Sequence, residues 1–429
     1  MSDSTEEASK PTAPFHICAR CDTPSLRVSY FQPFRIVQTC SQCGHRHVST
    51  PPVLDKRIIY LDQWVISGVA KALDPVTIKI KGTPSDADYW LALWDQLHRL
   101  VQLHIVVFPR SPIHQIESVV IPDYFSVHRA IYEHLAPNAE FYDPLVIFPK
   151  QVGKVYRSLR DAVEYPSTVL TRREALVANP NQWADHVMRL RIGARWGKVS
   201  DEIARARELR ASADANLRSD AERWATQRKR SFKERFIEQQ KIGTHAFTES
   251  VKLGPLGSIA GVAIDIFHDL RTRSTTLDEA QRAFNKFLAS EPFLSVPYNQ
   301  LSAALFAAIA RKVAGGQRPD RINGGHWLDV STIAAYAPYC DAMCVDGYFA
   351  DLLLDADVTS YFRPFSCRFF SYQTKDAFLA YLKDLERTAP SGLTDTVAAL
   401  FGDTWTAPYR TILEYARNRD KKTGYDKLL

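Results

Sequence analysis

Four of the seven cysteines lie in two Cys-x-x-Cys pairs close to the amino terminus. The pairs are Cys18 with Cys21 and Cys40 with Cys43. Their separation suits tetrahedral coordination of Zn²⁺ by four thiolates. A zinc ion held by four sulfurs has no open position, so we expect a structural site and no catalysis there. The intervening residues alternate as short strands do, and residues 15–50 are therefore predicted to form a zinc ribbon.

A single carboxylate closes an apolar stretch further along the chain. Residues 57–61 (RIIYL) are rich in β-branched and aromatic side chains, which predicts a buried strand. Asp62 follows at its carboxyl end, which in an open α/β sheet borders the crevice where ligands bind. A charge there is costly unless it is paired or bound to a metal, so Asp62 is a candidate metal ligand. The alternative is that Asp62 only caps the next helix.

Three more candidate aspartates occur in a second stretch, much later in the chain. Residues 326–336 are predicted to be helical, and Asp329 is either the cap of this helix or a metal ligand. Residues 342–345 are predicted to form a short buried strand, with Asp341 before it and Asp346 after it. Carboxylates carried by several strand–helix junctions can converge on a divalent ion, which prefers oxygen ligands.

The order of these motifs resembles that of PIN-like nucleases. The resemblance rests on IIYLDQWVIS around Asp62, on LDVSTIAAYAPYCDAMCVDGYF, and on the closing strand and helix FSCRFFSYQTKDAFLAYL. In that family a strand-end Asp, a helical Glu and one or more late Asp residues bind Mg²⁺ or Mn²⁺ and cut phosphodiester bonds. The resemblance covers residues 57–150 and 297–385 and implies an α/β core with a central, mostly parallel sheet.

The helical acid that the resemblance implies is Glu117. Residues 103–108 are predicted to form a second parallel strand, and a helix begins at Pro112. Glu117 lies in the second turn of that helix, and without the resemblance it would be interpreted as an exposed carboxylate. His114 lies three residues earlier, near the same face, and is a weaker candidate. Five acids are thus predicted to hold Mg²⁺ or Mn²⁺: Asp62, Glu117, Asp329, Asp341 and Asp346.

Basic residues are abundant in a region rich in strong helix formers, between residues 183 and 241. The densest cluster comprises Arg228, Lys229, Arg230 and Lys233. A positive helical face beside an acidic metal site could hold a nucleic-acid backbone. The alternative is that these charges only solvate a long exposed helix. The arginines and histidines of the ribbon could likewise face a phosphate backbone or be only solvated side chains.

The length of 429 residues allows two or three domains. We expect a disordered tail over residues 1–14, the zinc ribbon, and a PIN-like core formed by residues 57–150 and 297–429. A basic helical insertion, residues 151–296, interrupts the core. The net charge of +6 permits a polyanionic partner without requiring one. No apolar run is long enough to span a bilayer, and there is no basic-then-apolar leader, so a cytoplasmic location is expected.

These features predict a metal-dependent endonuclease, a hydrolase of phosphodiester bonds with structural zinc and catalytic Mg²⁺ or Mn²⁺. RNA is favoured over DNA by the resemblance alone. One alternative is a nucleic-acid-binding or assembly protein with the same fold and no catalysis. Another is a metal-dependent phosphohydrolase acting on a small molecule. The sequence leaves open whether the chain forms a homo-oligomer or binds a partner protein.

Overall fold

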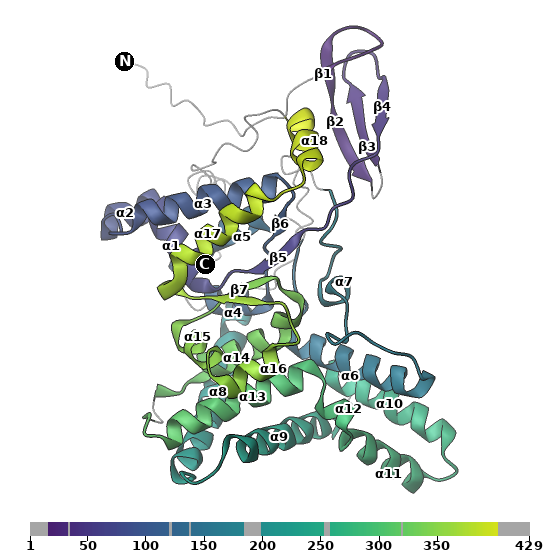
Figure 1. Cartoon of the computed structure of the whole chain (residues 1–429), viewed down its shortest axis with the longest axis vertical. Helices are drawn as coiled ribbons and strands as arrows, with labels where there is room; N and C mark the ends of the chain where they lie inside the picture. The colour runs from purple at the N-terminus through teal and green to yellow at the C-terminus, as the bar shows by residue number, and fades with distance from the viewer. Residues whose placement is uncertain are drawn as a thin grey trace.

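The computed structural model describes residues 16–32, 35–119, 122–136, 139–183, 199–252, 258–318 and 321–401. A small antiparallel sheet stands at one end, a parallel sheet with helices around it forms the middle, and a layer of helices forms the other end (Figure 1). The tail predicted for residues 1–14 lies outside the described residues.

The antiparallel sheet has the strand order β1-β2-β3-β4. Its strands are β1 (His16–Ile17), β2 (Pro24–Gln32), β3 (Arg35–Cys40) and β4 (Arg46–Ser49). The register pairs Leu26 with Cys40 across β2 and β3. Gly44, directly after the second cysteine pair, has a φ of +69°, a backbone conformation that glycine adopts without steric cost. The start of β2 therefore lies beside the end of β3, and this brings the two cysteine pairs together.

The central sheet has four strands in the order β6-β5-β7-β8, and every neighbouring pair is parallel. The strands are β5 (Arg57–Tyr60), β6 (Val106–Val107), β7 (Ala342–Cys344) and β8 (Arg368–Phe370). The register places Ile59 opposite Ala342 and Tyr60 opposite Met343. The predicted mixed α/β fold with a parallel sheet is confirmed.

Both faces of the central sheet are buried. On one face of the sheet, Ile59 packs with side chains of α1, α3, α5, α17 and α18. On the other face, Ile58 and Tyr60 pack with side chains of α6, α8 and α13–α16. This alternation follows from the period of two in a strand. The helices on the first face are α1 (Gln63–Leu73), α3 (Ala87–Gln102), α5 (Pro122–Leu135), α17 (Lys375–Arg387) and α18 (Ser391–Phe401). On the second they are α6 (Pro144–Asp161), α8 (Val199–Thr226), α13 (Pro297–Ala314), α14 (Gly324–Tyr336), α15 (Gly347–Leu353) and α16 (Ala356–Phe362).

Helix α1 approaches α3 closely because a glycine faces a tryptophan. A Cβ atom on Gly68 would lie 2.4 Å from the ring of Trp90. Trp90, Trp94, Leu97 and Val101 recur at helical spacing along α3 and are all buried, as the sequence predicted. Their tryptophans are core residues.

The helices between residues 151 and 296 have a core of their own but also join the central one. The remaining helices of the chain are α2 (Pro75–Lys81), α4 (Pro112–Val119), α7 (Arg172–Ala175), α9 (Phe232–Lys252), α10 (Ser258–Arg273), α11 (Leu277–Leu288) and α12 (Glu291–Leu294). Side chains of α6, α9, α10, α11 and α12 form a separate apolar cluster. Leu217, Ala221 and Trp224 of α8 pack in the core of the central sheet. Helix α6 crosses the domain boundary expected at residue 150.

Two 3₁₀ turns complete the described elements, one over Ala337–Tyr339 and one over Tyr372–Thr374. Within the described part of the chain, no helix combines the length and the apolar character needed to cross a membrane.

Candidate metal centres

The four cysteines of the antiparallel sheet form one cluster. The Sγ atoms of Cys18 and Cys43 are 3.6 Å apart, as are those of Cys21 and Cys40. All four sulfurs lie within 4.8 Å of one another, and the cluster is half-buried to buried. This arrangement of four sulfurs can bind a metal such as zinc.

Hydroxyl and amide groups surround these sulfurs. The Ser25 hydroxyl lies 2.9 Å from Cys40 Sγ, and the Thr23 hydroxyl lies 3.0 Å from Cys21 Sγ. The hydrogen bond from Ser25 is the main cause that lowers the pKa of Cys40 to about 5. The bond to Thr23 likewise lowers the pKa of Cys21. Because metal ligation needs the thiolate, these partners favour the ligating form of both cysteines.

Two of the predicted acids, Asp62 and Asp346, lie at the carboxyl ends of adjacent parallel strands. Asp62 follows β5 at the residue before α1, but its side chain does not make the capping hydrogen bond that the alternative interpretation required. Asp346 follows β7 and accepts a hydrogen bond of 3.1 Å from the backbone N–H of Gly347, at the start of α15. Burial raises the pKa of Asp62 to about 7, and the charge of Asp346 adds to this effect.

Among the described residues, no arginine or lysine forms an ion pair with either carboxylate. A half-buried acid near a second acid, without a protein cation, is an environment that a proton or a metal ion would stabilise. Asp346 is exposed, so the pair is reached from solvent.

A histidine that the sequence interpretation missed lies beside this pair. Burial lowers the pKa of His326, and the nearby charge of Asp346 acts in the opposite direction. Asn323 caps α14, and its backbone N–H donates to the His326 ring. The His326 ring packs edge-on against Tyr348, with a centroid distance of 4.9 Å. The only signal in the sequence was the capping pattern Asn-x-x-His, which gives no chemical role.

His114, the weaker candidate, lies inside the core. Its ring stacks between Tyr60 and Tyr132, each at a centroid distance of 4.6 Å. Burial lowers its pKa to about 3, so the ring is neutral near neutral pH. His128 on α5 is similar: it contacts Gln63 over 2.7 Å, and burial lowers its pKa to about 4.

The assignment of Asp341 to this site is wrong, because Asp341 lies at the amino end of β7, whereas Asp62 and Asp346 lie at the carboxyl ends of their strands. It precedes β7, and its Oδ2 atom accepts a 2.8 Å hydrogen bond from the backbone N–H of Ile58, near the start of β5. Its Oδ1 atom accepts from Arg57 at 3.0 Å and from Arg172 at 2.9 Å. In a parallel sheet all amino ends lie on one side and all carboxyl ends on the other, so Asp341 and Asp346 cannot share a metal. Asp341 is a structural ion-pair residue.

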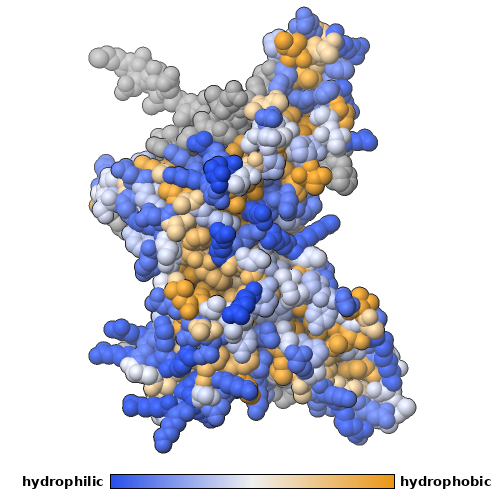
Figure 2. Space-filling model, viewed as in Figure 1, coloured by the Kyte–Doolittle hydropathy of each residue, from blue (hydrophilic) through white to orange (hydrophobic). Residues whose placement is uncertain are grey.

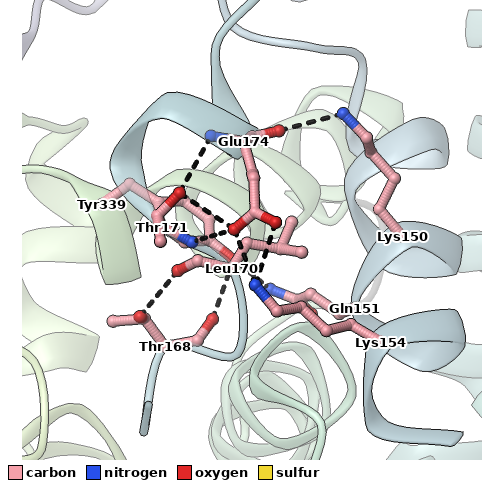
Figure 3. A network of polar contacts seen from close by, with 8 residues as sticks. All are labelled: Lys150, Gln151, Lys154, Thr168, Leu170, Thr171, Glu174 and Tyr339. Atoms are coloured by element: carbon pink, nitrogen blue, oxygen red, sulfur yellow. Dashed lines mark hydrogen bonds and ion pairs between the residues drawn. The ribbon is translucent and has the colours of Figure 1, made fainter. Parts of the chain in front are cut away.

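Arg172 reaches Asp341 from α7, and a polar network fixes this short helix (Figure 3). Glu174 accepts from both the backbone and the hydroxyl of Thr171, and Lys154 forms an ion pair with it over 2.7 Å. Lys154 and these Thr171 groups lower the pKa of Glu174 to about 2, although partial burial acts to raise it.

The loop before α7 is anchored to the turn before β7. The Tyr339 hydroxyl accepts from Gln151 at 2.6 Å and donates to the Thr168 carbonyl at 3.0 Å. The network therefore ties the predicted insertion to the amino edge of the central sheet.

The remaining two acids of the predicted site have different outcomes. Helix α14 begins at Gly324, so Asp329 lies in its second turn, and the interpretation of Asp329 as a cap is wrong. Asp329 is half-buried, three residues after His326. Glu117 belongs to helix α4, but its side chain lies outside the described residues.

The described side chains contain only one close group of three or more potential metal ligands, the four cysteines. Asp62 and Asp346 are thus a pair and have no third described ligand within the same short distance.

The basic cluster lies at the turn between α8 and α9. Arg228, Lys229, Arg230 and Lys233 are all exposed there. Arg230 forms an ion pair with Glu238, whereas no ion pair within the described residues involves the other three. Figure 2 shows hydrophilic side chains projecting at the corner of the molecule where α8 and α9 meet.

Comparisons with protein-family models, with curated proteins and with solved structures find no match to this chain. The function of the chain is therefore inferred from the geometry of the acids, the cysteines and the basic cluster.

Proposed function

We propose that the chain is a metal-dependent nuclease whose catalytic centre includes Asp62 and Asp346. The observation that carries the proposal is the placement of these two carboxylates at the carboxyl ends of the neighbouring parallel strands β5 and β7, where the charge of Asp346 adds to burial in raising the pKa of Asp62. The oxygen donors of the pair fit Mg²⁺ or Mn²⁺, and no described cation of the protein neutralises them. Carboxyl ends of parallel strands are also the usual place for ligands in open α/β sheets.

The chain's own residues would have distinct roles. Asp62 and Asp346 would hold the divalent ion, with Glu117 and Asp329 as further candidates on α4 and α14. When bound, such an ion lowers the pKa of a water molecule and neutralises charge on the leaving oxygen. His326 is neutral near neutral pH and lies next to Asp346, so it can accept a proton from a water or a hydroxyl group in this region.

Two further parts of the molecule support action on a polymer. The exposed Arg228, Lys229 and Lys233 are free to contact phosphates, because within the described residues none of them forms an ion pair. The cysteine cluster would hold a structural zinc ion that fixes the antiparallel sheet. RNA is the proposed substrate on the strength of the PIN-like resemblance.

The test uses the purified full-length chain with labelled RNA, single-stranded DNA and duplex DNA, in Mn²⁺ or in chelator. We expect RNA cleavage that requires Mn²⁺. Asp62→Asn and Asp346→Asn should each reduce cleavage at least about 100-fold, because loss of a direct ligand costs more than loss of an outer one. Asp376→Asn, on the exposed face of α17, is the matched control and should retain full activity. Absence of cleavage of all three polymers under every metal would exclude the nuclease.

One observation favours a second function, nucleic-acid binding without catalysis. Among the described side chains, no third carboxylate lies within close ligand distance of Asp62 and Asp346. In that case Asp62→Asn leaves RNA affinity unchanged, while replacement of the basic cluster weakens it. A small-molecule phosphohydrolase would instead turn over a phosphate ester with no effect of the basic cluster.

A further inference from the structure

A cavity of about 270 Å³ opens among helices α8, α9, α13 and α14. This volume is slightly below the range of roughly 300–1,000 Å³ that holds drug-sized ligands, which suits a ligand of one or two rings. Its apolar side is formed chiefly by Trp327 of α14, Phe306 of α13 and Ile242 of α9. Trp327 and Phe306 are both partly exposed, so aromatic surface is presented to an occupant.

The lining of the cavity also carries hydrogen-bonding groups. Asn216 and Asp220 come from α8, and Gln239 comes from α9. Asp220 uses its Oδ1 atom in an ion pair of 2.8 Å with Arg223. Burial raises the pKa of Asp220, and the nearby Glu238 adds to this effect. Donors and acceptors are thus both present within one small space.

Gln239 distinguishes this cavity from a simple packing defect. The side chain is 8% exposed, and its Nε2 atom is buried without a hydrogen-bond partner among the described residues. A buried donor without a partner is destabilising, so such a group usually has a ligand or a water molecule as its partner. The neighbouring Gln240 is different, because its Nε2 atom donates to the Leu294 carbonyl at 3.0 Å.

We propose that this cavity binds one unpaired nucleobase of a single-stranded nucleic acid. The ring of the base would lie against Trp327, and its hydrogen-bonding edge would face Gln239 and Asp220. A nucleobase is the ligand class that matches both kinds of lining residue, because it is planar and apolar on its faces and carries donors and acceptors on its edge. Glutamine in particular can pair with both a donor and an acceptor of one base.

The place of the cavity relates it to the proposed catalytic centre. Trp327 directly follows His326, whose ring lies near Asp346. Consecutive side chains leave a helix axis about 100° apart, so neighbouring residues of α14 face different places: His326 faces Asp346 and Trp327 faces the cavity. A strand that passes over this end of α14 could set one base in the cavity and its backbone near the acids. This link to cleavage rests on the proposed function, whereas base binding itself does not.

The experiment measures binding of adenosine, guanosine, cytidine and uridine to the full chain by equilibrium dialysis, without added divalent ions. Nucleosides contain no phosphodiester bond, so failure of the nuclease proposal leaves this readout intact. We expect at least one nucleoside to bind saturably at one site per chain. Gln239→Leu, which keeps the volume and removes the amide, should weaken binding at least about tenfold. Trp327→Ala should have an effect of similar size.

Gln240→Leu is the matched control on the same helix and should keep nucleoside affinity within about twofold, since its amide points to Leu294. Thermal melting of every variant separates loss of binding from loss of fold. The proposal is overturned if none of the four nucleosides binds, or if Gln239→Leu binds them as the wild type does. It is also overturned if toluene binds equally well and displaces them, because the cavity is then merely apolar.

A competition arm separates the two sources of a base. A short single-stranded oligonucleotide that displaces the bound nucleoside supports a polymer as the natural ligand. Failure to displace it overturns the assignment to a polymer and leaves free nucleosides as the ligand.

Discussion

The negative charge of Asp346 lies close enough to Asp62 to raise the pKa of the Asp62 carboxyl group. The two residues are 284 positions apart (346 − 62) and meet because β5 and β7 are neighbours in one parallel sheet. Neither belongs to the hydrophobic core, and each stands at the start of a helix. Two carboxylates therefore lie close together, which raises the free energy of the ionised pair, at the carboxyl ends of parallel strands, where open α/β sheets bind ligands.

The first prediction concerns the pH dependence of stability without divalent ions. The pKa of Asp62 is about 7 in the folded chain, against 3.8 for an ordinary aspartate. Well below pH 3.8 the carboxyl group is protonated in both states and has no effect. The destabilisation of the folded state grows between pH 3.8 and pH 7 and is complete above pH 7, where the group is ionised in both states. At about 1.36 kcal/mol per pKa unit, the loss reaches at most about 4 kcal/mol.

Asp62→Asn should therefore stabilise the metal-free chain strongly at pH 8 and much less near pH 4.5. Urea unfolding of both proteins at the two pH values measures the difference. An equal difference at both pH values would show that Asp62 is not the titrating group. Saturating Mn²⁺ at pH 8 should narrow this difference by stabilising the wild type alone, by about 2.7 kcal/mol at one hundred times the dissociation constant.

The second prediction separates Asp341 from the proposed catalytic pair, Asp62 and Asp346. Asp341→Asn should lower the free energy of unfolding by about 2 kcal/mol, because two arginines and one backbone amide lose a charged partner. The cost stays below that of a fully buried pair, since Arg57 and Arg172 are 51% and 39% exposed. Cleavage per folded molecule should stay near that of the wild type. A loss of cleavage as large as that of Asp346→Asn, in a folded variant, would contradict this assignment.

The third prediction concerns the cysteine cluster. Elemental analysis of the purified chain should find one zinc ion per molecule. Cys40→Ser should lose this ion and make the segment before residue 50 sensitive to protease, because a small sheet without its metal has little core. Cys367→Ser is the matched control, since Cys367 lies outside the cluster, and it should keep the zinc. Full zinc content in Cys40→Ser would argue against coordination by four sulfurs.

The fourth prediction concerns the turn between α8 and α9. Replacing Arg228, Lys229 and Lys233 by alanine should weaken RNA binding and reduce the slope of log affinity against log salt by about 2, at about 0.7 per phosphate contact. Arg230→Ala should have less effect on binding, because Glu238 already pairs with Arg230. The comparison is made by titration at several salt concentrations. Lys286→Ala on α11 is the control and should leave this slope unchanged. If the triple variant also leaves the slope unchanged, the nucleic acid binds elsewhere on the chain.

Much of the central sheet could be predicted from local sequence. The run from Ile58 to Leu61 contains only residues that suit a buried strand, and Asp62 marks its end. The two cysteine pairs were equally informative, because their spacing admits few structures. Both signals are local, so no knowledge of distant contacts was needed.

The prediction that Asp341 belongs to the same site as Asp346 failed because it required tertiary information. Acids on both sides of a three-residue strand cannot lie at one edge of a parallel sheet, yet sequence spacing alone treats them alike. Which of the two faces the ligand edge depends on strand direction. Arg172, the residue that identifies Asp341 as structural, comes from a helix that no pattern connects to β7. The cavity beside Trp327 was also missed, because its walls come from four helices, and no local pattern shows which of their faces meet.

The position of β5 between β6 and β7 has a consequence for biosynthesis. Strand β6 leaves the ribosome soon after β5, but 234 residues (108–341) separate the end of β6 from the start of β7. At about 5–20 residues per second, one edge of β5 stays without its partner for on the order of 10 to 50 s. During that time the nascent chain exposes an unpaired strand edge of Ile and Tyr residues, which is a template for aggregation. The chain should therefore depend on chaperones during translation more strongly than a protein whose strands pair in order of synthesis.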